Sequence, residues 1–282
     1  MANLSNLKTE ILNTRDIGKI TNAMQLVASA KLRRIGKKVT ETQEYVFEVY
    51  SIFNEIIKHS SESIYLKNST NDIKKTLWVV VNSNLGLCGG YNTNVNKLVI
   101  SNFKKEDQIY AIGSKAVSAY NSKKLKIKNE CASVDIDFTL EQAKQIGNEL
   151  LSYYSSGEFD EIQIVYTKFI NNVTFEPTIL RVFPIIKDDT QEITSSSYYS
   201  FEPSAEEVLN NAVTLYLSTI IFGTIVESQV SEQASRRLAM ENATNNGKEL
   251  EYNLSIKYNR ERQASITQEI SEIVSGANAL ME

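Results

Sequence analysis

Residues 203–282 read PSAEEVLNNAVTLYLSTIIFGTIVESQVSEQASRRLAMENATNNGKELEYNLSIKYNRERQASITQEISEIVSGANALME, and no proline follows Pro203. Proline inside a helix costs about 3 kcal/mol or more, so this stretch can form one uninterrupted helix. Pro203 and Ser204 are typical start signals, and Glu206 and Glu207 fall in the first turn, where negative charge is favourable. Near the end, apolar residues recur at the coiled-coil spacing of four and three, namely Ile266, Ile270, Ile273, Ala277 and Leu280. We therefore expect residues 203–282 to form a C-terminal coiled-coil helix.

The first 176 residues also lack proline, which permits a second long helix over residues 1–60. One stripe of this segment follows the helical spacing of three and four, through Ile17, Ile20, Met24, Val27 and Lys31. Two long terminal helices with one apolar stripe each most simply pair with each other. We therefore expect an antiparallel coiled coil of the two ends of the chain.

The middle of the chain, residues 70–202, has a different pattern. Three apolar runs with the character of buried strands alternate with two helical segments. The expected strands are Leu77–Val81, Ile109–Gly113 and Glu161–Tyr166, and the expected helices are Asn94–Phe103 and Leu140–Ser155. Residues 173–186 and 198–202 indicate further extended segments. The alternation predicts a small, parallel, Rossmann-like α/β domain between the terminal helices, so the fold class is α/β with a long coiled coil.

Composition excludes several classes of protein. The formal net charge is −4, which gives no global basic field for nucleic acid. The longest apolar-rich segment, Val213–Val226, is shorter than the ~20 residues that span a bilayer, so we expect a soluble or peripheral protein. Cys88 and Cys131 do not form a metal-type cluster, and we expect free thiols.

The sequence contains no convincing group of catalytic residues. No phosphate-binding G-x-x-x-x-G-K-[ST] motif occurs, and Gly86–Gly90 does not fit a dinucleotide fingerprint. We interpret Gly86–Gly90 as a tight turn in which only glycine fits, and Asp107 as solvated surface. His59 is expected to be a surface or helix-capping group, and Cys88 a small packed residue rather than a nucleophile. The sequence thus predicts no catalytic residue, no cofactor, no metal site and no enzyme activity of its own.

Three segments together carry a resemblance to a known family. Residues 19–32 read KITNAMQLVASAKL, residues 86–90 read GLCGG, and residues 231–277 contain RQASITQEI and EIVSGA. In order and spacing they resemble the gamma-subunit family of F-type ATP synthases, over essentially the whole chain. The family usually has Thr-Asp-Arg before GLCGG, where this chain has Ser83-Asn84-Leu85, which puts the usual local contacts of that turn in doubt.

The resemblance implies a function as the central rotor shaft that couples proton flow to ATP synthesis or hydrolysis. It implies one copy per complex, with the coiled coil inside a hexamer of alpha and beta subunits. The α/β domain would rest with the epsilon subunit on the c-ring, at the cytoplasmic face of a bacterial membrane. Positions matching beta-subunit contacts are Met24, Lys31, Arg262, Gln263 and Thr267, and positions matching the c-ring foot are Tyr199 and Glu202.

Two alternatives stay open at this point. The acidic balance and the altered turn before Gly86 also fit the shaft of a divergent ATPase motor that is not coupled to a proton channel. A coiled-coil structural adaptor is the alternative of another class, and a nucleotide-binding α/β enzyme is a weaker one. Copurification of alpha and beta subunits would distinguish the shaft from both other classes.

Overall fold

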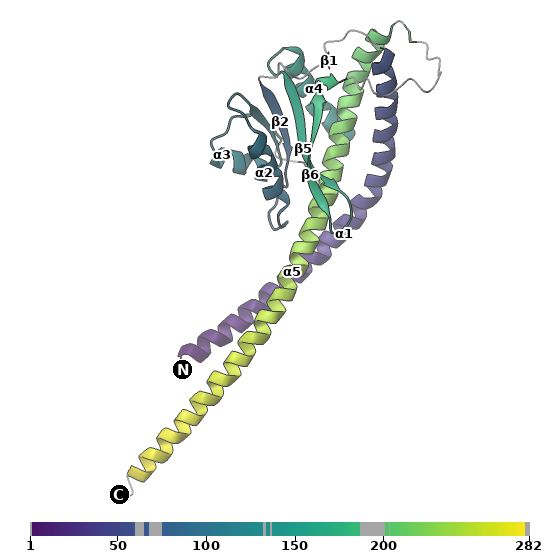
Figure 1. Ribbon diagram of the computed structural model, residues 1–282. Helices are drawn as coiled ribbons and strands as arrows, with labels where there is room; N and C mark the ends of the chain where they lie inside the picture. The colour runs from purple at the N-terminus through teal and green to yellow at the C-terminus, as the bar shows by residue number, and fades with distance from the viewer. Residues whose placement is uncertain are drawn as a thin grey trace. The chain divides into compact units, whose positions relative to one another are not determined.

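A computed structural model describes residues 2–59, 65–67, 75–131, 134–135, 137–186, 201–202 and 204–279 (Figure 1). The two long helices are α1 (Ala2–His59) and α5 (Ala205–Ala279), as the sequence predicts. The contacts divide the chain into two compact units. Unit 1 consists of Met1–Ala28 and Arg237–Glu282, and unit 2 of Ser29–Arg236, so each long helix contributes to both.

Unit 2 contains a five-stranded sheet whose strands follow the order β4-β3-β2-β5-β6. The strands are β2 (Thr76–Val81), β3 (Gln108–Ile112), β4 (Ile127–Cys131), β5 (Glu161–Phe169) and β6 (Phe175–Phe183). β2 to β5 are parallel, but β6 pairs antiparallel with β5, so the expectation of a parallel domain is wrong at this edge. β1 (Leu66–Lys67) and β7 (Ile185–Ile186) form a separate parallel pair.

Helices cover both faces of this sheet. α2 (Tyr91–Asn102) and α3 (Ser114–Ser122) cover one face, where Val95, Val99 and Tyr120 pack with Trp78 and Val80. α4 (Leu140–Ser155) lies on the other face together with α1 and α5 (Figure 1). α3 and β4 are not predicted from the sequence, because α3 is short and β4 is an edge strand that is only half-buried.

α1 and α5 approach closely in unit 2. Ile35 and Val39 of α1 form a buried cluster with Val226 and Val230 of α5. A Cβ atom on Gly223 would lie only 2.8 Å from Cγ2 of Val46, so the absence of a side chain there permits the approach.

The sequence-predicted apolar stripe of α1 does not form the helix contact in unit 1. An ion pair of 2.8 Å joins Arg15 to Glu251, and a hydrogen bond of 2.7 Å joins Thr21 to Thr244, which sets an antiparallel register. One residue turns a helix by 100°, so Ile17, Ile20 and Val27 face solvent, each 55–60% exposed, and the expectation for them is wrong. The buried and half-buried positions lie one residue further along the helix and include Thr14, Gly18, Thr21, Gln25 and Ala28.

The apolar part of α5 is core rather than free surface. Within the described residues, α5 alone contains a window that is long and apolar enough to cross a membrane, and 56% of that window is buried inside the protein. Leu217 and Ile221 lie against Gly147 of α4, and Leu209 and Val213 are fully buried. Packing within the chain therefore accounts for the apolar character of this segment.

Asp107 is buried, so its interpretation as solvated surface is wrong. Its carboxylate accepts hydrogen bonds from the backbone N–H of Thr76 at 3.0 Å, the indole N–H of Trp78 at 2.9 Å and the backbone N–H of Lys104 at 2.9 Å. These three donors hold the turn before β3 against the start of β2.

We expect Asp107→Ala to lower the free energy of unfolding of the α/β domain, because removing the acceptor leaves buried donors unsatisfied at about 1–3 kcal/mol each. Urea unfolding followed by the fluorescence of Trp78, the single tryptophan of the chain, measures this effect. The neighbouring exposed carboxylate supplies the control, Glu106→Ala, which should leave the midpoint unchanged. Equal midpoints for the two variants would contradict the assignment.

Candidate functional site

The Gly86–Gly90 turn connects β2 to α2 and has an unusual backbone. Leu87 has φ of 63° and Gly89 has φ of 59°, both in the left-handed region. The left-handed backbone at Gly89 favours glycine there. Gly86 has an ordinary φ, and a Cβ atom added to it would lie 3.8 Å from its nearest neighbour, Lys115 Cε, so a side chain would fit. The expectation that only glycine fits throughout this turn is therefore wrong, and a leucine occupies one of its two left-handed positions.

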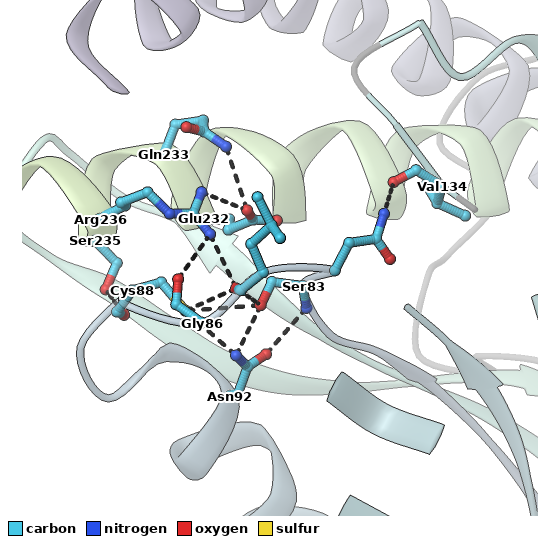
Figure 2. Close-up of polar contacts among 11 residues, drawn as sticks. Ser83, Gly86, Cys88, Asn92, Val134, Glu232, Gln233, Ser235 and Arg236 are labelled. Atoms are coloured by element: carbon cyan, nitrogen blue, oxygen red, sulfur yellow. Dashed lines mark hydrogen bonds and ion pairs between the residues drawn. The ribbon is translucent and has the colours of Figure 1, made fainter. Parts of the chain in front are cut away.

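Arg236 of α5 holds this turn (Figure 2). Its Nη2 donates to the carbonyl of Leu85 at 3.1 Å and to the carbonyl of Gly86 at 3.4 Å. Its Nη1 forms an ion pair of 2.6 Å with Glu232, one helical turn earlier, and both side chains are largely buried. One guanidinium thus links the α5 helix to two successive carbonyls of the turn.

A second set of contacts fixes the same turn from Cys88. The Ser235 hydroxyl donates to the Cys88 carbonyl at 2.6 Å, and Asn92 Nδ2 donates to the buried Cys88 thiol at 3.2 Å. Asn92 also accepts from the Ser83 N–H at 3.0 Å, and Asn84 donates to the Val134 carbonyl at 2.9 Å (Figure 2). The Ser83-Asn84 pair, which differs from the family pattern, therefore makes its own contacts, and Cys88 is a packed residue as expected.

The contacts of α5 extend along the helix to the end of β5. The Ser228 hydroxyl accepts from the Thr167 N–H at 3.0 Å, and the Ser231 hydroxyl donates to the Thr167 carbonyl at 3.0 Å. Thr167 lies beyond the last pair that β5 forms with β2, so these hydroxyls satisfy backbone groups that the sheet leaves open. Gln229 donates to the Asp135 carbonyl at 2.6 Å. We call this row of α5 side chains the polar seam; its members are Ser228, Gln229, Ser231, Glu232, Ser235 and Arg236.

The polar seam carries one buried charge pair. Burial raises the pKa of Glu232, and attraction to Arg236 and to Lys31 acts in the opposite direction. A buried carboxylate of this kind costs free energy unless it is paired and hydrogen-bonded, and Arg236 provides both. The arrangement joins the sheet to the helix and brings together no nucleophile and base, so it supports a mechanical rather than a chemical role.

The residues that the sequence singled out are not part of the polar seam. Met24 is half-buried, and Lys31, Arg262, Gln263, Thr267 and Glu202 are exposed. Thr267 donates only to the carbonyl of Gln263, one turn earlier in its own helix, at 2.9 Å. Tyr199, Pro203 and Leu280 lie outside the described residues. His59 ends α1, its Nδ1 2.8 Å from the Glu55 carbonyl, which fits the expected capping group.

The sequence does contain a signal for the polar seam. Ser228, Ser231, Glu232 and Ser235 recur at spacings of three and four within a helix that is otherwise apolar, which indicates one polar stripe on a buried helix. The partners of this stripe come from segments that are 61 to 151 residues away, so periodicity alone could not identify them.

Two other features bear on ligand binding. No group of three or more His, Cys, Asp or Glu that could hold a metal ion occurs among the described residues. A pocket of about 250 Å³ lies between α1, α5 and the β5–β6 edge of the sheet, lined mostly by apolar side chains that include Val39, Val46 and Ile220. Glu227 also borders it and accepts from the Phe169 N–H at 3.2 Å.

Comparison with known proteins gives consistent matches over the full length. A family model described as ATP synthase matches residues 3–280. The ATP synthase gamma chain of Mesoplasma florum is 94% identical over 281 residues, which cover 100% of both chains. The ATP synthase gamma chain of Mycoplasma mycoides subsp. mycoides is 63% identical over 279 residues, 99% of each chain.

Solved structures share the fold at low identity. A chain of the OSCP/F1/c-ring part of the Euglena gracilis mitochondrial ATP synthase has a TM-score of 0.74 and 18% identity, and the match covers 99% of this chain and 95% of that one. A chain of the rotor of the same enzyme has a TM-score of 0.71 and 16% identity, covering 94% and 99%.

We expect Arg236→Ala to loosen the turn at residues 85–90, because two carbonyls lose their donor and Glu232 loses its buried partner. Loss of a buried charge partner costs about 3–5 kcal/mol. Hydrogen exchange of the amides of residues 84–92 should accelerate measurably. The matched control is Arg237→Ala, because Arg237 forms a longer ion pair of 3.3 Å with Glu241 within its own helix. If both variants exchange alike at residues 84–92, Arg236 does not hold the turn.

Proposed function

The chain belongs to the ATP synthase gamma chain family, and from this premise we propose that it turns as the central shaft that couples proton flow to ATP synthesis or hydrolysis. As a gamma chain it is a non-catalytic subunit of a membrane-associated ATP synthase complex.

The observation that carries the proposal is the distribution of apolar residues in unit 1. Leu7 and Met240 are buried in unit 1, but over residues 14–28 of α1 most of the buried and half-buried positions are small or polar, such as Gly18 and Thr21, while other large aliphatic side chains face outward. The outward set, each more than half exposed, is Ile17, Ile20, Leu26, Val27, Leu250 and Ile256. An apolar surface of this kind marks an interaction site, and an enclosing ring of subunits would cover it.

The C-terminal end of α5 extends this argument. In the register set by the Arg15–Glu251 pair, the start of α1 reaches about residue 264 of α5. Beyond that point Ile266, Ile270 and Ile273 are 47–71% exposed and have no α1 residue opposite them. We propose that the alpha and beta subunits cover this stripe.

Polar groups on the same unit are available for directional contacts. Arg262, Gln263 and Thr267 are exposed, and we propose that they bind loops of the beta subunits, with Met24 contributing from α1.

A basic run in unit 2 offers a further contact. Lys31 is exposed and belongs to this run, together with Arg33, Arg34, Lys37 and Lys38. Arg34 forms an ion pair with Asp137, and Lys38 donates a hydrogen bond to the Phe138 carbonyl. Only part of the basic run is therefore available to a partner. Exposed ion pairs contribute about 0–1 kcal/mol each, so torque should come mainly from apolar packing.

The polar seam suggests how force passes between the parts of unit 2. We propose three domains, with coiled-coil helices at residues 1–60 and 203–282 and the α/β domain at residues 70–202. Because Arg236 and Ser235 bind the turn after β2, and Ser228 and Ser231 bind β5, the α/β domain cannot rotate about α5 without breaking these bonds. A load applied to the α/β domain would therefore turn the helix.

We propose the c-ring and the epsilon subunit as the partners that apply this load, at the cytoplasmic face of the membrane. Tyr199 and Glu202 match the foot on the c-ring, and Glu202 is exposed and available for such a contact. One asymmetric shaft among three like sites gives each site a different environment. Rotation then shifts which site binds nucleotide tightly, so that binding free energy is exchanged for torque.

Replacing the outward stripe at the end of α5 should weaken assembly. For Ile266→Ser with Ile270→Ser and Ile273→Ser we expect roughly hundredfold weaker binding to alpha and beta subunits, from about 1 kcal/mol of lost apolar burial per side chain. Competition against the unmodified chain during reconstitution measures this. The control is Gln268→Ala with Glu272→Ala, a hydrogen-bonded pair on the opposite face of the same helix. Unchanged competition by the isoleucine variant would contradict the proposal.

The foot can be tested separately. We expect Tyr199→Ala with Glu202→Ala to preserve ATP hydrolysis by the head but to lower ATP-driven proton pumping, because the contact with the c-ring is weakened. Both activities are measured on membranes that carry the variant complex. If the unmodified complex pumps no protons and purifies without a c-ring, the chain is instead the shaft of a divergent ATPase motor that is not coupled to a proton channel.

A further inference from the structure

We propose that the α/β domain carries a binding surface for anionic lipid headgroups, formed by five lysines at one edge of its sheet. We call this surface the lysine rim; its members are Lys104, Lys105, Lys123, Lys124 and Lys126. All five are exposed, and none of their ammonium groups forms an ion pair within the described residues. Five like charges on two short turns form a concentrated positive surface on a chain whose net charge is −4.

The two turns that carry the lysines lie side by side. Residues 103–107 lead into β3 and residues 122–126 lead into β4, and these strands are parallel neighbours with Ile109 opposite Ile127. The Ile109 N–H donates to the Lys126 carbonyl at 3.0 Å, which joins the second turn directly to β3. Neighbouring strands are about 4.8 Å apart, so the charges gather at one edge of the sheet.

Both turns have a defined backbone. The Lys104 N–H binds the buried Asp107 carboxylate, and the Asp107 N–H returns to the Lys104 carbonyl at 3.2 Å. In the second turn the N–H groups of Lys123 and Leu125 donate to the Tyr120 carbonyl, and Lys124 has φ of 56°. Asp107 is turned inward, so Glu106 is the one exposed carboxylate within these two turns. The rim therefore presents its charge on a preformed surface.

The rim lies at the end of unit 2 where α5 begins. The carboxyl end of β5 contacts Ser228 and Ser231, which lie more than 20 residues after the start of α5. The amino end of β5 pairs with Phe183, and the Phe183 ring stacks on Tyr154 at the end of α4. The rim is at the amino ends of β3 and β4, which are parallel to β5 through β2. It thus shares the end of the unit that holds Glu202, and its direction toward the membrane rests on the proposed function.

The chemistry of the rim favours lipid over nucleic acid. Binding of single strands uses exposed aromatic rings on which bases stack. Phe103 is the one aromatic residue in these turns, and it is only half-exposed and packs against the core around Val95 and Val99. Ammonium groups without neighbouring aromatic rings respond to the charge density of a surface. Each lysine near an anionic bilayer contributes about 1 kcal/mol of binding free energy, which raises the affinity roughly fivefold.

The test is binding of the purified full-length chain to vesicles, measured by flotation. Vesicles of phosphatidylcholine are compared with vesicles that contain about 30 mol% phosphatidylglycerol, which gives a strongly anionic surface. The variant is Lys105→Gln with Lys123→Gln and Lys124→Gln. The matched control removes three exposed positive charges elsewhere in unit 2, as Lys97→Gln with Lys115→Gln and Lys144→Gln.

We expect binding to anionic vesicles only, lost at high salt because the Debye length falls to about 3 Å at 1 M. The rim variant should bind roughly a hundredfold more weakly, and the control variant should bind like the unmodified chain. Equal binding to both vesicle types, an equal loss in both variants, or tighter binding of the unmodified chain to single-stranded RNA than to anionic vesicles would overturn the proposal. The assay contains no c-ring, so failure of the foot to couple to proton pumping would leave its outcome unchanged.

Discussion

The structure depends on one segment of α5 that is enclosed on every side. From Tyr216 to Arg236 no residue is exposed, although the segment makes about six turns of helix. A helix in this position must satisfy apolar neighbours and open backbone groups at the same time. It does so by dividing its circumference, with Leu217, Ile221 and Ile225 in the sheet core, Val226 and Val230 against α1, and the polar seam against the turns and β5.

This division explains why the α/β domain and the helix act as one body in unit 2. A purely apolar contact has no preferred direction and permits sliding, whereas hydrogen bonds have a fixed geometry. Ser228 and Ser231 hold one strand residue by both of its backbone groups, and Arg236 holds two successive carbonyls. The buried Glu232 orients that guanidinium, so replacing either partner affects a contact that the other one makes.

The sequence predicts the elements of this protein better than their faces. The distribution of proline predicts both long helices, and Ser204 predicts the start of α5. The Ser204 hydroxyl does cap α5, since it accepts a hydrogen bond from the Glu207 N–H at 3.2 Å. The stripe predicted for α1 lies one position away from the contact, because large aliphatic residues are typical of a core, whereas between residues 14 and 28 the contact uses mostly small and polar ones. Burial of Asp107 escapes prediction because two of its three donors come from β2, and no local pattern indicates a partner about 30 residues away. The contacts with other subunits rest on resemblance, since they lie outside the chain.

The isoleucines at the end of α5, Ile266, Ile270 and Ile273, are exposed in the isolated chain. A helical segment without tertiary contacts is marginal in water when it is only about 15 residues long, because nucleation is unfavourable and packing supplies most helical stability. Residues 265–277 have no α1 residue opposite them and would be in that position until the proposed partners enclose them. Under the proposed assembly, folding of this end would be linked to partner binding by mass action, and a chain left without partners would offer a frayed, apolar end to proteases and chaperones.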